Sequence, residues 1–151
     1  MIPEAKLIKS EIMIRELSLP DDVLLARKSI VRWLALSLGL IMPNESRTLL
    51  LDIFDVLLEF HAKGVSPTTK EIIDRLEAPG GEKQNPKAVY YHLQRLTNMG
   101  ILTRNKGKYY FGDGDGKSMP DVFRDFYKNK SDSAFGNIEK ALRKLENGYR
   151  Q

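Results

Sequence analysis

The sequence predicts a mainly α-helical protein with one small β-hairpin. Apolar residues recur at spacings of three and four through most of the 151 residues, as in helices that bury one face. Two short segments rich in β-branched and aromatic residues, ILTR and KYYF, flank the turn-forming residues 105–107. A chain of this length can bury one core of moderate size, so we expect one central domain with helical extensions.

Residues 1–43 are expected to form an N-terminal helical extension. We predict one helix over 3–17 and another that opens at Pro20, where two carboxylates favour the positive end of the helix, and runs to about Leu38. The apolar residues of the second helix wrap around more than one face, which favours burial against a second subunit. The residues that we expect at this dimer interface are Trp33, Leu34 and Leu38.

Two helices are predicted next. The first runs from a cap at Asn44 to a stop at Gly64, and the segment SPTTKEIIDRL, residues 66–76, predicts a shorter one. The first of these helices should supply much of the core, through the apolar residues Leu50, Ile53, Phe54, Leu57, Leu58 and Phe60.

A third helix is predicted over about residues 85–99. Asn85 can cap it, and Pro86 suits its first turn, where a missing N–H costs nothing. Gly100 suits the left-handed residue that ends many helices. Its apolar residues Val89, Leu93 and Leu96 recur at helical spacing and should be buried, which leaves the polar, cationic and tyrosine side chains on other faces.

The segments ILTR and KYYF should pair as a hairpin over about residues 101–111. The turn Asn105-Lys106-Gly107 has residues that tolerate positive φ angles. Side chains alternate between the two faces of a strand, and we expect Tyr110 to point inward and its neighbours outward.

The segment from Val65 to Gly112 resembles the winged helix-turn-helix domain of ArsR-, MarR- and PadR-type regulators of bacteria and archaea. In this resemblance AVYYHLQRLTNMGILTR is the end of a recognition helix and the first wing strand, SPTTKEIIDRL is the preceding helix, and GKYYF is the returning strand. The connection from Glu77 to Gln84 is longer than the tight turn usual between these helices. The resemblance implies a DNA-binding domain over residues 44–112.

Charge is concentrated in the same part of the chain. Residues 82–108 contain six basic residues and one acidic residue, a formal charge of +5, whereas the whole chain carries +4. Polyanionic duplex DNA is therefore the expected partner, with Arg and Gln suited to guanine and adenine edges and the wing cations to phosphates. The candidate DNA-binding residues are Lys83, Lys87, Tyr90, Tyr91, Gln94, Arg95, Asn98, Arg104, Lys106 and Lys108.

Residues 113–151 are expected to form a glycine-rich connector and a two-part helical tail that can also support dimerisation. Apolar residues near its end repeat at alternating spacings of three and four, as in the seam of a coiled coil. Only about two heptads are present, so packing of an amphipathic helix on its own subunit is an equal alternative. The seam residues are Phe135, Ile138, Leu142, Leu145 and Tyr149.

We expect no enzymatic activity, cofactor or metal. The chain has no cysteine, which excludes disulfides and thiol catalysis, and it has no phosphate-binding loop or nucleophile elbow. The alternating acids at Asp113 and Asp115 lack the twelfth-position Glu of a calcium loop, because that position is Arg124. No signal peptide is expected, and the apolar run 33–42 is too short to span a bilayer, so we expect a cytoplasmic protein.

Two functions fit the sequence. The first is a homodimeric, sequence-specific transcription regulator that reads DNA with the helix at 85–99 and the wing at 101–111. The second is a winged-helix module that binds protein in a transcription, replication or chromosome-handling complex, because fold alone does not decide function. The sequence identifies no operator, target gene or small-molecule effector.

Overall fold

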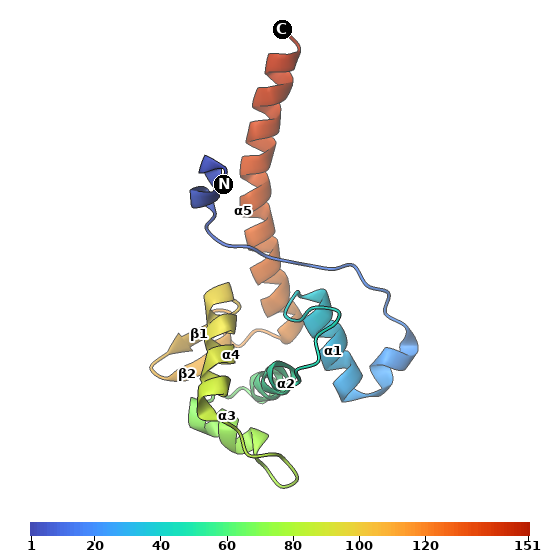
Figure 1. Cartoon of the computed structure of the whole chain (residues 1–151), viewed down its shortest axis with the longest axis vertical. Helices are drawn as coiled ribbons and strands as arrows, with labels where there is room; N and C mark the ends of the chain where they lie inside the picture. Colours follow the sequence, from blue (N-terminus) through green and yellow to red (C-terminus); the bar gives the residue numbers. More distant parts are fainter.

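The computed structural model describes the whole chain, Met1 to Gln151, as five α-helices, two short 3₁₀ helices and one antiparallel hairpin (Figure 1). None of the helices combines the length and the apolar character that crossing a membrane requires. The elements in chain order are η1 (Pro3–Leu7), η2 (Asp21–Leu25), α1 (Arg27–Ser37), α2 (Leu49–Ala62), α3 (Thr69–Leu76), α4 (Pro86–Met99), β1 (Leu102–Asn105), β2 (Lys108–Phe111) and α5 (Met119–Tyr149).

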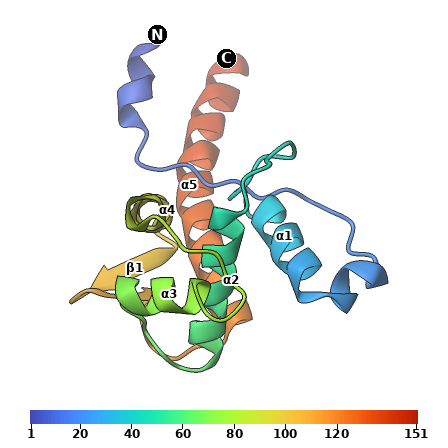
Figure 2. The ribbon, with the colours of Figure 1, turned by 60° about the horizontal axis from the view of Figure 1, so that its bottom comes forward.

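Helix α2 is the centre of the core, and α1, α3, α4, β2 and the start of α5 all contact it (Figure 2). Its apolar residues are buried as predicted, except that Phe60 is only half-buried. The Phe54 ring meets the rings of Phe111 and Phe123 edge-on, at centroid distances of 6.1 and 6.3 Å. Aromatic pairs of this geometry hold both the hairpin and α5 against α2, and the rings of Phe111 and Phe123 also contact each other, with centroids 5.2 Å apart.

The segment 66–76 forms its helix from Thr69 to Leu76, and side-chain caps begin both α3 and α4. The Thr68 hydroxyl accepts the N–H of Glu71, and the Glu71 carboxylate accepts the N–H of Thr68, so α3 begins with a complete capping box. The Asn85 side chain caps α4 by accepting the N–H of Lys87, and Gly100 ends it at φ 92°. The predicted helix over 85–99 is therefore confirmed.

The hairpin is confirmed, but the predicted inward position of Tyr110 is wrong. Leu102 pairs with Phe111, and the turn residues Lys106 and Gly107 have φ angles of 53° and 77°, as a two-residue type I′ turn requires. Tyr109 and Phe111 are buried, whereas Tyr110 is half-buried on the opposite face. Phe111 packs on α2 and so decides which face of β2 points inward. Tyr109 shares that face, because alternate residues of a strand lie on the same side.

Two predicted helix starts are also wrong. The helix expected from Pro20 to Leu38 is interrupted at Ala26, whose backbone is extended (φ −134°, ψ 134°). The Ser29 hydroxyl donates to the Val23 carbonyl at 2.6 Å, and this hydrogen bond holds η2 against the start of α1 in place of a continuous helix. Helix α2 begins after Thr48 rather than at Asn44. The preceding residues form a turn in which the Glu45 N–H bonds to the Met42 carbonyl.

The N-terminal helix predicted over 3–17 exists only as η1, and the residues that follow are extended (Figure 1). This segment crosses the end of α1. The Arg15 N–H donates to the Ser37 carbonyl at 2.7 Å, and the Arg15 guanidinium donates to the carbonyls of Leu36 and Ile41 at 2.6 and 2.9 Å. The extended chain thereby satisfies carbonyls that the end of a helix leaves free.

The C-terminal tail is one continuous helix, α5, and not the two-part tail that was predicted. Its first turns pack on the core through Val122 and Tyr127, while every residue from 131 onward is exposed. The helix projects well beyond the remainder of the molecule (Figure 1). Residues 131–133, Ser-Asp-Ser, do not break the helix. Lys128 and Asp132, one turn apart, form an ion pair that supports it there.

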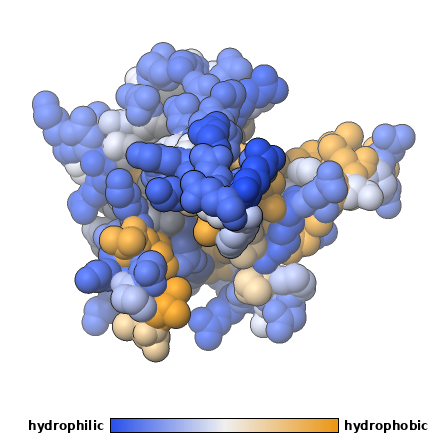
Figure 3. All heavy atoms as spheres, turned by 90° about the horizontal axis from the view of Figure 1, so that it is seen from above, coloured by the Kyte–Doolittle hydropathy of each residue, from blue (hydrophilic) through white to orange (hydrophobic).

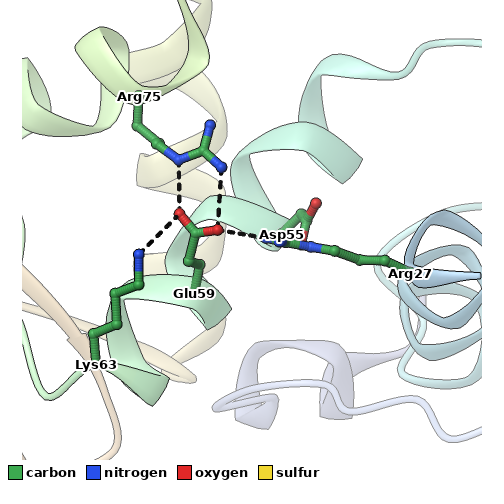
Figure 4. Close-up of polar contacts among 5 residues, drawn as sticks. All are labelled: Arg27, Asp55, Glu59, Lys63 and Arg75. Atoms are coloured by element: carbon green, nitrogen blue, oxygen red, sulfur yellow. Dashed lines mark hydrogen bonds and ion pairs between the residues drawn. The ribbon is translucent and has the colours of Figure 1, made fainter. Parts of the chain in front are cut away.

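A carboxylate on α2 connects three helices (Figure 4). Glu59 is bound by Arg75 of α3 at 2.7 Å, by Arg27 of α1 at 3.0 Å and by Lys63, the residue directly after α2, at 3.9 Å. Arg27 also binds Asp55 at 2.7 Å. The hydrogen bonds from Arg75, and then those from Arg27, lower the pKa of Glu59 to about 2 despite its partial burial.

Candidate nucleic-acid interface

The exposed face of α4 carries a row of polar side chains. Lys87, Tyr91, Gln94 and Asn98 follow one another at spacings of three and four, opposite the buried Val89, Leu93 and Leu96. The Gln94 amide nitrogen donates to the Asn98 side-chain oxygen at 3.0 Å, which fixes two amides relative to each other. Amides in this arrangement can donate to and accept from base edges.

Two tyrosines widen this face. Tyr91 is 61% exposed and lies in the polar row, and Tyr90 is 48% exposed at its edge. All seven candidate residues from the loop before α4 and from α4 itself are exposed, as the sequence predicts: Lys83, Lys87, Tyr90, Tyr91, Gln94, Arg95 and Asn98.

The hairpin presents its cations beside α4. Arg104, Lys106 and Lys108 are all exposed, and the Arg104 guanidinium lies 5.6 Å from the centroid of the Tyr109 ring. The hairpin is anchored to the loop before α3, because the N–H of Tyr109 donates to the Pro67 carbonyl at 2.8 Å. This hydrogen bond holds the hairpin against the loop that precedes α3.

The basic residues of this region have no acidic partners. Ten ion pairs occur in the protein, and none of them involves a basic residue from the segment 82–108. Their charge is therefore available to an external anion, whereas Arg27, Arg75 and Lys117 are neutralised within the protein.

A small cleft of about 70 Å³ lies along one edge of the polar row, between α4 and the segment that precedes α2. It is lined by Tyr91, His92 and Arg95 of α4 and by Arg47, together with Ile41, Glu45 and Leu50. Sequence reasoning missed Arg47. One signal was present, because a cation just before the positive end of a helix is unfavourable unless an anion lies nearby.

The long connection from α3 to α4 is folded on itself. The Glu77 carboxylate accepts the N–H of Gln84 at 2.5 Å, and Gly81 lies so close to the Leu76 carbonyl that a Cβ there would overlap it. The loop thus closes without separating the two helices, which also contact each other directly. Lys83 lies on the outside of this loop.

Asp115 and His61, whose side chains are of types that bind metal ions, have other partners. Asp115 pairs with Lys117, His61 Nε2 lies 2.8 Å from the Lys117 carbonyl oxygen, and no group of three His, Asp or Glu side chains is arranged to hold a metal ion. The two histidines are far apart in the sequence and belong to different surroundings, the first beside Phe111 and the second beside Tyr91.

The residues expected at a dimer interface fall into two groups. Trp33, Leu34 and Leu38 are half-buried within one subunit, and the Trp33 indole N–H donates to the Ser18 carbonyl at 2.8 Å. They offer less free surface than the sequence suggested. The second group, on α5, is about half exposed throughout: Phe135, Ile138, Leu142 and Leu145.

Other apolar side chains are exposed near the N-terminus. Leu24 and Leu25 of η2 are 52% and 84% exposed. Figure 3, which looks down on the end of α5, shows a mainly hydrophilic face with hydrophobic residues gathered toward its edges, including the arm that carries η2.

Comparison of the chain with protein-family models, with characterised proteins and with solved structures gave no match.

Proposed function

We propose that this protein is a sequence-specific DNA-binding transcription regulator with a winged helix-turn-helix domain. In this proposal α3 and α4 form the helix-turn-helix, α4 enters a major groove, and the hairpin is the wing. The observation that carries the proposal is the exposed polar row on α4 flanked by cations that have no acidic partner. A helix of this kind matches the width and the hydrogen-bonding groups of the major groove.

The side chains divide into two roles. Gln94 and Asn98 are suited to base edges, because a side-chain amide can donate to and accept from adenine at the same time. Lys83, Arg104, Lys106 and Lys108 are suited to phosphates, which position a protein on DNA without reading its sequence. Lys87, Tyr90, Tyr91 and Arg95 lie between these groups and can contact either.

We further propose that the protein acts as a homodimer joined through the projecting part of α5. Its apolar residues lie on one side of the helix at heptad spacing, and about half of each side chain is exposed in one subunit. Glu139 and Glu146, next to this stripe, are already paired with Arg143 and Arg150 of the same helix. A two-fold dimer would present two copies of α4 to paired half-sites.

A protein-binding role remains the second candidate. The observation that favours it is the exposure of Tyr90 and Tyr91, since tyrosine is enriched where proteins bind one another. The unpaired cations around these tyrosines favour a polyanion instead, so we rank this role second.

Selection from a pool of random duplexes tests the proposal. The intact protein should enrich a defined sequence, arranged as two related half-sites if it binds as a dimer. Binding without enrichment would show a nonspecific DNA-binding protein. Failure to retain any duplex at low salt would remove the DNA proposal and leave the protein-binding role.

A further inference from the structure

The cleft beside α4 has the composition of an anion site. The side chains of Arg47 and Arg95 line it from two different parts of the chain, together with the aromatic rings of Tyr91 and His92. Its volume of about 70 Å³ exceeds the roughly 10–15 Å³ that one water molecule needs, so phosphate oxygens can enter it. Neither arginine forms an ion pair with a carboxylate.

The histidine in the cleft lacks a partner. His92 Nδ1 is buried and makes no hydrogen bond. The pKa of His92 is lowered first by burial and then by the charges of Arg95 and Arg47, against a smaller opposing effect of Glu45. Burial and the two guanidinium groups thus disfavour the charged imidazolium, and an anion between the two arginines would oppose their contribution.

The one acid in the cleft leaves the arginines free. The Glu45 carboxylate accepts the backbone N–H of Arg47 at 3.3 Å, and neither guanidinium binds it. Helix α2 begins two residues after Arg47, and the Thr48 side chain makes no capping hydrogen bond. The N–H groups of the first turn add positive potential beside Arg47, which Asp52 in the same turn offsets in part.

We propose that this cleft binds one phosphate group of the DNA backbone, with Arg47 and Arg95 as its principal ligands; this rests on the proposed function. A phosphate between two guanidinium groups receives charge-assisted hydrogen bonds, the strongest that side chains form. The Tyr91 hydroxyl is a further donor, and a protonated His92 imidazole can donate from either ring nitrogen.

The position of the cleft fits this role. Tyr91 and Arg95 belong to α4, the helix proposed to enter the groove, so the cleft opens beside the surface that faces the bases. In Figure 2, which shows α4 nearly end-on, α2 lies on one side of α4 and β1 on another. Cations of the cleft and of the wing therefore flank the helix, as two phosphate backbones flank a major groove.

The test uses the full chain with Arg47→Ala, and with Arg124→Ala as a charge-matched control from an exposed arginine of α5 that has no ion pair. Loss of Arg47 should weaken binding about tenfold on selected and random duplexes alike. It should also reduce the slope of log affinity against log salt by about 0.9, the contribution of one phosphate. The Arg124 variant should bind as the unmodified protein does.

Nuclear magnetic resonance of the His92 ring supplies a second measurement. Duplex DNA should raise the pKa of His92 in the unmodified protein, because a phosphate stabilises the imidazolium, and this rise should be much smaller in the Arg47 variant. If DNA binds but neither the affinity of the variant nor the pKa of His92 changes, the cleft proposal is wrong and the proposed function stands.

Inorganic phosphate, added alone, separates the remaining outcomes. If no duplex binds, the proposed function fails, and the phosphate titration then shows whether the cleft binds an anion at all. A shift of the His92 resonances that requires Arg47 would then identify a site for a free phosphate group rather than for DNA. Absence of any shift under those conditions would overturn the anion site altogether.

Discussion

The Glu59 carboxylate accepts two hydrogen bonds from the Arg75 guanidinium, at 2.7 Å from Nε and 3.1 Å from Nη2. This bidentate pair joins the central helix α2 to α3, the helix that precedes α4 in the chain (Figure 4). Arg27 binds the same carboxylate from α1. A single acidic side chain of α2 is therefore bound by arginines from both α1 and α3.

This arrangement predicts a specific dependence of stability on pH. The pKa of Glu59 is lowered from 4.5 to about 2 in the folded protein, so the stabilisation is complete above about pH 4.5 and is lost as the pH falls toward 2. Glu59→Gln should lower the free energy of unfolding by about 1–2 kcal/mol at neutral pH, a modest value because both arginines are about half exposed.

Urea denaturation of both proteins at several pH values measures this effect. The difference between the unmodified protein and Glu59→Gln should shrink as the pH falls from 4.5 toward 2. A difference that is the same at pH 7 and pH 2.5 would show that the pairing of the carboxylate does not cause it.

The hairpin register predicts unequal roles for two adjacent aromatic residues. Phe111 is buried against Phe54, whereas Tyr110 is half-buried on the other face. Phe111→Ala should cost about 3–5 kcal/mol of stability, as for other buried aromatics. Tyr110→Ala should cost no more than about 1 kcal/mol. Chemical denaturation measures both, and the reverse order would contradict the register.

The ends of α4 show what local sequence can predict. Asn85 and Gly100 define the helix through interactions within a few residues, a side-chain cap and a positive φ angle, so the predicted bounds were confirmed. The inward face of β2 was predicted wrongly because KYYF has aromatic residues on both faces of the strand. The wholly apolar Phe111 would have given the phase, since its ring has no polar group to present to water.

Other errors arose from contacts between distant residues. The extended N-terminal segment depends on Arg15, whose guanidinium binds carbonyls more than 20 residues away. For the same reason Arg47 was not recognised as a neighbour of Arg95, because only the packing of α4 beside α2 brings them together.

Readout of bases by α4 predicts a loss of specificity when one amide is removed. Gln94→Ala should weaken binding to a selected site by about 1–3 kcal/mol and leave binding to random duplex nearly unchanged. Asn137→Ala, which removes an exposed amide from α5, is the control and should alter neither. Equal losses on both kinds of DNA would make Gln94 a backbone contact rather than a base contact.

Dimerisation through α5 predicts that two acidic substitutions in the apolar stripe will separate the subunits. Leu142→Asp with Leu145→Asp should give a folded monomer in sedimentation experiments, since both side chains are about half exposed in one subunit. Asn137→Asp with Asn147→Asp changes the charge equally on another side of α5 and should remain dimeric. A monomeric unmodified protein would contradict the proposal, and a dimeric leucine variant would place the interface elsewhere, for example around Trp33.

The salt dependence of binding to duplex DNA tests the central claim most directly. If α4 and the wing bind DNA through unpaired cations, log affinity should fall linearly with log salt, with a slope of roughly −0.9 for each phosphate neutralised. Replacing Arg104, Lys106 and Lys108 together by Ala should flatten this slope and weaken binding to all sequences alike. Affinity that is independent of salt, or no binding to duplex at low salt, would contradict the account.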